Sequence, residues 1–150
     1  MADPTTQKFE DLSVSVEFDP VGASGTYTKI CGIKGASVTR TANMDSDETG
    51  DCSDESLPYK VKKSVRSLEV MVSGQGTWAQ ESHDKMMDWW RSGATLNVKV
   101  TNAGVASGEI EVESGPAFLS QLNNTREKGK LVTAEIQIEF ETLPSTTNKS

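Results

Sequence analysis

The sequence has little of what marks a membrane, secreted or metal-binding protein. Of its 150 residues two are cysteine and one is histidine, hydrophobic residues make up 35%, and apolar runs reach only two or three residues. A transmembrane helix needs about 20 apolar residues, so we expect none. Met1-Ala2-Asp3-Pro4 has neither a basic start nor an apolar stretch, so we expect no secretory signal. Free thiols in a reducing compartment are the default for Cys31 and Cys52, with a bridge between them as the alternative.

The chain also lacks an excess of positive charge. Its net charge of −7 and pI near 4.7 argue against a protein that grips nucleic acid by neutralising phosphates. Residues 1–58 carry four basic and eleven acidic side chains, whereas residues 59–150 carry eleven of each. Such an acidic run indicates either a solvated loop or one part of a two-signed surface for head-to-tail contact between copies. Its members are Asp45, Asp47, Glu48, Asp51, Asp54 and Glu55, and the basic group that follows is Lys60, Lys62, Lys63 and Arg66.

What the sequence does contain is alternation of apolar and polar residues, the pattern of strands with one buried face. It is clear in segments 12–18, 65–73, 96–100, 109–113 and 132–141, and weaker in 26–30 and 33–41. Residues 42–58 hold Gly, Pro, Ser and acids with almost nothing apolar, which predicts a long loop. We expect the connection 114–130 to fold back on the domain, and the polar tail from Pro144 to be disordered unless a partner orders it.

One segment has a helical period. Thr77-Trp-Ala-Gln80 has the form of a capping box, and the less polar positions after it occupy about half of a helical wheel. Gly93 supplies a C-terminal stop. We therefore predict a mainly β protein, a β-sandwich or open barrel of about seven strands with one flanking amphipathic helix over residues 77–92. A single domain would span residues 1–142, followed by a polar tail over 143–150.

Candidate catalytic chemistry is sparse. The single histidine, His83, falls at the margin of the apolar helix face, which favours a structural role over catalysis. The two cysteines lack the Cys-x-x-Cys spacing of a zinc site. Three tryptophans, Trp78, Trp89 and Trp90, stand at helical spacing without interleaved bases, which favours packing over base stacking. We predict no enzyme, no cofactor and no metal.

The acidic run allows one alternative. Asp45-x-Asp47-x-Thr49-Gly50-Asp51 resembles the opening of a calcium loop, in which oxygens at alternate positions converge on the ion. The twelfth position, where a bidentate carboxylate belongs, is Ser56, and no helix pair flanks the segment. An EF-hand is excluded, and a weak surface calcium site stays open.

The order of the predicted elements resembles the major tail (tail tube) proteins of long, non-contractile-tailed phages. The similarity is clearest over residues 64–142, and these segments carry it: Ser67-Leu-Glu-Val-Met-Val-Ser-Gly-Gln-Gly76, the helix ending Trp89-Trp90-Arg91-Ser92-Gly93-Ala94, the short strands around Val98 and Val112, and Val132-Thr-Ala-Glu-Ile-Gln-Ile-Glu-Phe140. The same fold is similar to the tubes of contractile tails and type VI secretion, and to the tails of phage-derived gene transfer agents.

The resemblance implies a structural virion protein that self-assembles into hexameric rings. The rings would stack into a hollow tail tube through which DNA passes into the host cell. The implied partners are further copies of the chain, the tape measure, tail terminator and distal tail proteins, and DNA in transit without specific binding. The implied location is the virion tail, assembled in the bacterial host cytoplasm.

Within that picture, the acidic loop 42–58 would reach a neighbouring ring and meet the basic group Lys60, Lys62, Lys63 or Arg66. A lumen that conducts a polyanion should repel it, and alternating carboxylates supply such faces. The candidates are Glu109, Glu111, Glu113, Glu135, Glu139 and Glu141, and alternation alone leaves open which row points inward. The alternative function is a monomeric β-sandwich binding module that uses the acidic loop for calcium or a basic partner.

Overall fold

The computed structural model describes residues 6–22, 24–30 and 32–150, and it confirms a mainly β fold with one α-helix. Eight strands form one antiparallel sheet in the order β2-β1-β5-β6-β7-β4-β3, and β8 pairs with β6. The strands are β1 (Leu12–Val16), β2 (Thr28–Lys29), β3 (Ile33–Thr49), β4 (Lys60–Thr77), β5 (Leu96–Asn102), β6 (Ile110–Thr125), β7 (Thr133–Phe140) and β8 (Ser145–Asn148). The helical elements are η1 (Phe9–Asp11), η2 (Gln80–Ser82) and α1 (His83–Ser92). Cys31, for which we predicted a free thiol, lies outside the described residues.

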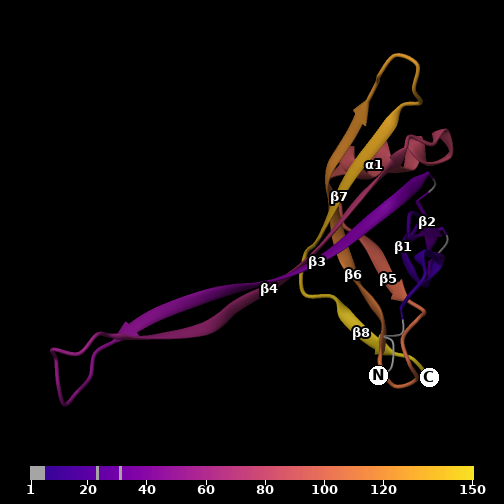
Figure 1. The fold of residues 1–150 in the computed structure, drawn as a ribbon. Helices are drawn as coiled ribbons and strands as arrows, with labels where there is room; N and C mark the ends of the chain where they lie inside the picture. Colours follow the sequence, from indigo (N-terminus) through magenta and orange to yellow (C-terminus); the bar gives the residue numbers. More distant parts are fainter. Residues whose placement is uncertain (1–5, 23, 31) are drawn as a thin grey trace.

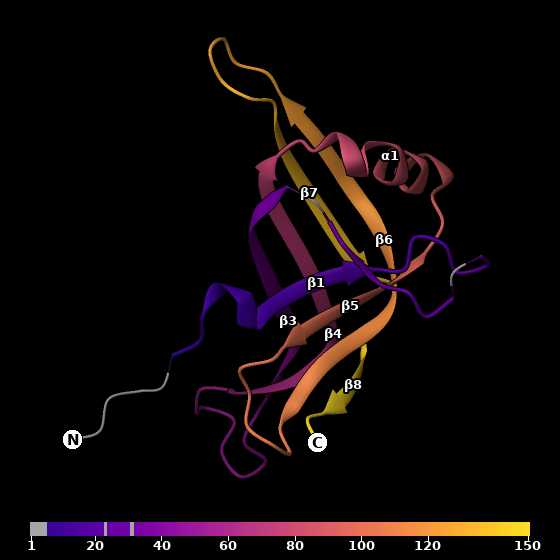
Figure 2. The ribbon, with the colours of Figure 1, turned by 90° about the vertical axis from the view of Figure 1, so that its right-hand side faces the viewer.

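The sheet folds over on itself because its two halves share β6. The first part of β6 pairs with β5 and β8, and the second part pairs with β7. The partner strand of β6 changes from β5 to β7 at Ala117, which stands opposite Leu96 on one side and Phe140 on the other. Strands β1 and β5 consequently run across β4 in Figure 2. The result is the predicted sandwich, with side chains of both halves in one core.

The core lies between the two halves, and α1 closes it. Val16 of the first half and Ile138 of the second are both fully buried. From α1, Met86 and Trp89 enter the same cluster and are 2% and 3% exposed. The indole N–H of Trp89 donates to the carbonyl of Ala94 at 3.0 Å, so its one polar group is satisfied. Burial of each such side chain contributes about 1.5–3 kcal/mol, which makes α1 part of the core.

The helix begins later than we predicted. Thr77 is the last residue of β4, and the N–H groups of Thr77 and Trp78 donate to backbone carbonyls of neighbouring segments at 3.0 and 2.8 Å. Because these N–H groups already donate to other backbone carbonyls, the predicted capping box of Thr77 and Gln80 does not form. The α-helix proper starts at His83, after the turn η2. Its predicted end is confirmed, since Gly93 follows with a φ of 65°.

The predicted loop 42–58 is largely strand. Strand β3 continues to Thr49 and β4 starts at Lys60, so the loop is residues 50–59. Strand β4 pairs with β7 only from Met71 onward, and residues 41–69 leave the body as a two-stranded ribbon that we call the arm (Figure 1). At about 3.3 Å per residue, its strands reach about 30 Å before the loop. The prediction failed because a ribbon exposed on both faces needs no apolar alternation.

Two further predictions are corrected. The connection 114–130 is mostly the second part of β6, which continues to Thr125. The tail from Pro144 is not disordered, because Ser145–Asn148 forms β8 along β6 and raises the strand count to eight. Alternation missed β8 because its side chains are all exposed, so no buried face marks it as a strand. Among the described residues, no helix is long and apolar enough to cross a membrane.

Candidate assembly surfaces

The two faces of the arm carry different side chains. The strand register places Met44 opposite Val65 and Glu48 opposite Val61. Because side chains alternate along a strand and paired residues share a face, these four lie on one face together with Ser46 and Lys63. We call this the apolar arm face. The other, the polar arm face, consists of Asp45, Asp47, Thr49, Lys60, Lys62 and Ser64.

The apolar arm face is open in a single subunit. Met44, Val61 and Val65 are 51%, 56% and 55% exposed. A two-stranded ribbon is marginal in water unless something packs against it. Contact with another molecule would therefore stabilise the arm as well as bury these side chains.

The predicted acidic and basic groups face each other within one arm. The Arg66 guanidinium lies 3.7 Å from a carboxylate oxygen of Asp45, and Lys62 stands directly across from Asp47. Lys60 and Lys63 instead stand across from Thr49 and Ser46, and contact of the basic group with acids of another copy stays a prediction. Exposed pairs of this kind contribute about 0.2–1 kcal/mol each and help to hold the two strands in register.

Three of the predicted acids, Asp51, Asp54 and Glu55, lie in the loop at the tip of the arm. Asp51 accepts a hydrogen bond from the backbone of Ser53 at 2.7 Å. Asp54 accepts from the hydroxyl and the backbone of Ser56 at 2.6 and 3.0 Å, and these bonds hold the pKa of Asp54 below its ordinary value. Residues 50–59 contain three acids and no base, so the tip is anionic. Cys52 is exposed beside them.

The geometry of the arm argues against the surface calcium site that the sequence left open. Asp45, Asp47 and Thr49 alternate along an extended strand, so their side chains stand about 7 Å apart instead of converging. Within the described residues there is no group of three or more His, Cys, Asp or Glu placed to hold a metal.

Strand β7 presents carboxylates on the side of the sheet that faces away from the core. Its residues Ala134, Ile136 and Ile138 are buried, and Glu135 and Glu139 point to the opposite side and are exposed. We call that side the carboxylate sheet face. Register adds these neutral or acidic neighbours from β3, β4 and β6: Ser37, Glu69, Ser73, Gln75, Gln121 and Asn123.

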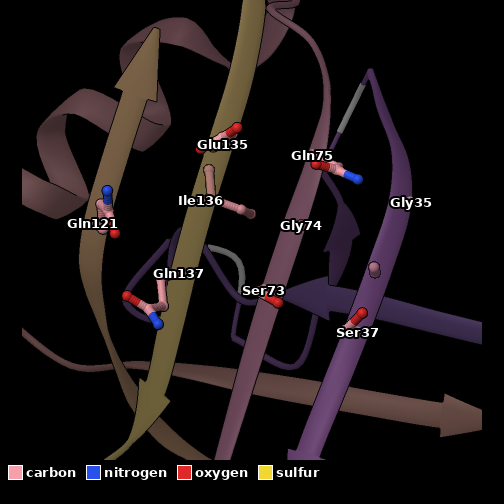
Figure 3. Close-up of a pocket in the computed structure, with 10 residues that line it drawn as sticks. Gly35, Ser37, Ser73, Gly74, Gln75, Gln121, Glu135, Ile136 and Gln137 are labelled. Atoms are coloured by element: carbon pink, nitrogen blue, oxygen red, sulfur yellow. The ribbon is translucent and has the colours of Figure 1, made fainter.

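A shallow hollow of about 420 Å³ lies in this face between β3, β4, β7 and β6 (Figure 3). Gln75, Gln121, Glu135 and Gln137 surround it, and none of its lining residues is lysine or arginine. The hollow is therefore mostly polar, with one carboxylate and no cationic group among its lining residues to hold a phosphate.

The other predicted lumen acids lie elsewhere. Glu113 stands opposite the buried Val100, so its side chain points to the core side of the sheet. There the Arg40 guanidinium donates to it, with one N–H···O distance of 3.0 Å, and this bond raises the pKa of Arg40. Glu111 lines a surface cavity together with Arg40 and Glu113. Glu109 precedes β6. The structure thus separates Glu109, Glu111 and Glu113 from Glu135 and Glu139.

The Arg40–Glu113 ion pair has a structural role that the sequence did not reveal. Arg40 is the last residue of β3 before the arm, and Glu113 belongs to the opposite half of the sandwich. The pair joins the base of the arm to the body at a place where β3 has no strand partner on its outer side. It therefore restrains the direction in which the arm leaves the body.

His83 and two of the three tryptophans take packing roles. His83 is half-buried, and its ring lies edge-on to Trp78 with centroids 5.3 Å apart. Trp89 is buried in the core, and Trp90 is 49% exposed. Trp78 and Trp89 thus take the packing roles predicted from the helical spacing, whereas Trp90 does not do so within the single subunit.

Comparison with known proteins identifies the family. The family model described as "Phage tail tube protein" matches residues 7–145. The chain belongs to the phage tail tube protein family. Membership assigns this tail tube protein a structural part in phage-type tails. No curated protein sequence matches it significantly.

Solved structures show the same fold at low sequence identity. The tail of an empty gene transfer agent particle, refined with C6 symmetry, superimposes with a TM-score of 0.73 at 12% identity, covering 95% of this chain and 99% of that one. The virion of a native gene transfer agent gives 0.68 at 11% identity with the same coverages. The SPP1 tail tube gives 0.65 at 8% identity, covering 95% of this tail tube protein and 80% of that chain.

Proposed function

We propose that this tail tube protein self-assembles into hexameric rings that stack into a hollow tube for the passage of DNA. The observation that carries the proposal is the arm, which extends about 30 Å from the body with apolar side chains open to solvent. The similar gene transfer agent tail has C6 symmetry, which supports six subunits per ring. Its partners would be other copies, the tape measure, tail terminator and distal tail proteins, after assembly in the host cytoplasm, and it would have no enzymatic activity.

In this proposal the arm makes the contact between rings. Asp45 and Asp47 have basic neighbours on their own arm, so the acids available to a second copy are chiefly Glu48 and those of the tip loop. Arg66 and Lys62 stand beside Asp45 and Asp47 of their own arm, and Lys60 and Lys63 would be the bases that receive acids of a neighbouring copy. Repetition around a ring makes individually weak contacts sufficient.

The carboxylate sheet face would line the bore. Glu135 and Glu139 stand on it without a lysine or arginine in the adjoining hollow, and they would repel passing phosphates. Glu113 does not share this role, because Arg40 neutralises it.

Electron microscopy of the purified full-length protein in negative stain, over a range of concentrations, tests the assembly. We expect rings or tubes of uniform bore. Dispersed single subunits at every concentration would contradict the proposal, and a saturable response of tryptophan fluorescence to calcium in those subunits would favour the binding-module alternative.

A charge reversal tests the bore. Glu135→Lys with Glu139→Lys should give tubes that retain DNA in a salt-dependent manner, whereas wild-type tubes do not. A matched control, Glu81→Lys with Asp84→Lys, makes the same change of charge near α1 and should leave DNA unbound. If both variants behave alike, the carboxylate sheet face does not line the bore.

A further inference from the structure

A narrow apolar groove opens where the sandwich is not closed. It lies between β1 and β3, the facing strands of the two halves, and encloses about 220 Å³. Leu12, Val14, Ile30 and Ile33 form its walls, and core residues such as Ile136 form its floor. Burial of such an apolar opening against a partner would remove apolar surface from water and so stabilise the contact.

Both strands beside the groove have unpaired edges. Strand β1 pairs on its outer side with β2 only at Ser15 and Val16, which leaves residues 12–14 without a partner there. Among the described residues, strand β3 pairs only with β4. Unpaired edges accept an additional extended segment through their backbone N–H and C=O groups. The groove therefore suits an extended chain with apolar side chains.

The charged side chains at the rim of the groove have a net positive charge. Lys29 and Lys34 line it on the β2 and β3 sides, and Glu10 is the one acid among its lining residues. A partner segment should therefore carry acids next to apolar side chains.

The tip of the arm carries acidic side chains next to exposed apolar ones. Leu57 and Tyr59 are exposed in the loop, and Val61 follows on the apolar arm face. Glu48 and Glu55 are close to them in the sequence and have no ion-pair partner among the described residues. The hydrogen bonds that Asp51 and Asp54 make within the loop preorganise it, which reduces the entropy lost on docking.

The arm cannot fill the groove of its own subunit. Residue 36 lines the groove and residue 49 ends β3, so the continuous strand holds the tip about 40 Å away. The view in Figure 1 agrees, since the arm extends straight out from the body. The occupant must come from another molecule, and every further copy of this chain carries a suitable tip.

We propose that the β1–β3 groove is the docking site for the arm tip, residues 48–61, of a second copy of this chain. The inference rests on the proposed function and adds to it the receiving surface. Docking would close the open side of the sandwich with the neighbour's apolar side chains and pair its acids with Lys29 and Lys34.

A complementary charge swap tests the contact in the full-length protein. The groove variant is Lys29→Glu with Lys34→Glu, and the tip variant is Glu48→Lys with Glu55→Lys. Each alone should raise the concentration needed for assembly by about tenfold, because about two exposed ion pairs become repulsive. The chain carrying all four substitutions should return to near the wild-type value. If it assembles no better than either variant, the tip and the groove do not meet.

A control separates this effect from net charge. Arg126→Glu with Lys128→Glu, in the turn between β6 and β7, makes the same change of charge as the groove variant, away from the groove. We expect it to assemble like the wild type. Impairment of this control but not of the groove variant would overturn the proposal in favour of the β6–β7 turn.

Cross-linking of the unmodified protein supplies a second readout. Equal amounts of ¹⁵N-labelled and unlabelled chains are assembled and treated with a thiol–amine cross-linker, which joins Cys52 at the tip to nearby lysines. Mixed-isotope peptides should link Cys52 to Lys29 or Lys34. Tubes without these links would overturn the docking site and leave the proposed function intact, whereas absence of both tubes and links between copies would contradict the proposed function itself.

Discussion

Replacement of the apolar side chains of the arm is the change whose effect the structure predicts most fully. The variant is Met44→Ser, Val61→Ser and Val65→Ser. Each side chain is about half exposed in the single subunit, so contact has about half of it left to bury. Full burial of such a side chain gives about 1.5–3 kcal/mol, so the remaining half gives about 1 kcal/mol each and about 3 kcal/mol per arm. The affinity of each arm contact should fall about 100-fold.

The assay is sedimentation of assembled tubes as a function of total protein concentration. The triple variant should need a far higher concentration to pellet, while its melting temperature changes by only a few degrees, because exposed substitutions alter subunit stability little. A matched control on the polar arm face, Asp47→Asn with Lys62→Gln, keeps the net charge and should pellet like the wild type. Normal pelleting of the triple variant would refute the reasoning, since it would mean that the apolar arm face contacts nothing in the tube.

Two predictions concern the subunit itself. Gly76→Ala should destabilise the fold by about 2–4 kcal/mol, because a Cβ there would overlap the carbonyl oxygen of Gly32 and lie 2.7 Å from a backbone nitrogen. At the control position, Gly35→Ala, the Cβ meets nothing closer than 3.9 Å. This control should be nearly neutral in thermal denaturation. Arg40→Gln and Glu113→Gln should each cost about 1 kcal/mol or less, since the pair is partly exposed; a double-mutant cycle with no coupling energy would show that the pair does not join the arm to the body.

The body of the fold could largely be predicted from alternation and helical period. Residues 132–141 alternate strictly, and Thr133–Phe140 within them form strand β7. The half-wheel pattern predicted a helix whose Met86 and Trp89 are buried. These signals work because one face of each element is buried and the other is not. The start of α1 was missed since Thr77 and Trp78 bond to neighbouring segments, which no local capping pattern reveals.

The assembly surfaces could be predicted only in part. The acidic composition near Asp47 indicated a functional segment, but that its partner across the arm is Lys62 depends on strand register. Met44, Val61 and Val65 were overlooked because single apolar residues in a polar segment have no meaning until pairing brings them to one face. Glu135 and Glu139 follow from alternation, whereas the ion pair of Glu113 with Arg40 joins residues 73 positions apart and leaves no local signal.

Cryo-electron microscopy of the assembled tube, with helical reconstruction, tests the central claim most directly. We expect six subunits per ring, the carboxylate sheet face with Glu135 and Glu139 around the bore, and each arm crossing to a subunit of the adjacent ring. A reconstruction in which the arms fold against their own subunits and another surface lines the bore would contradict the account.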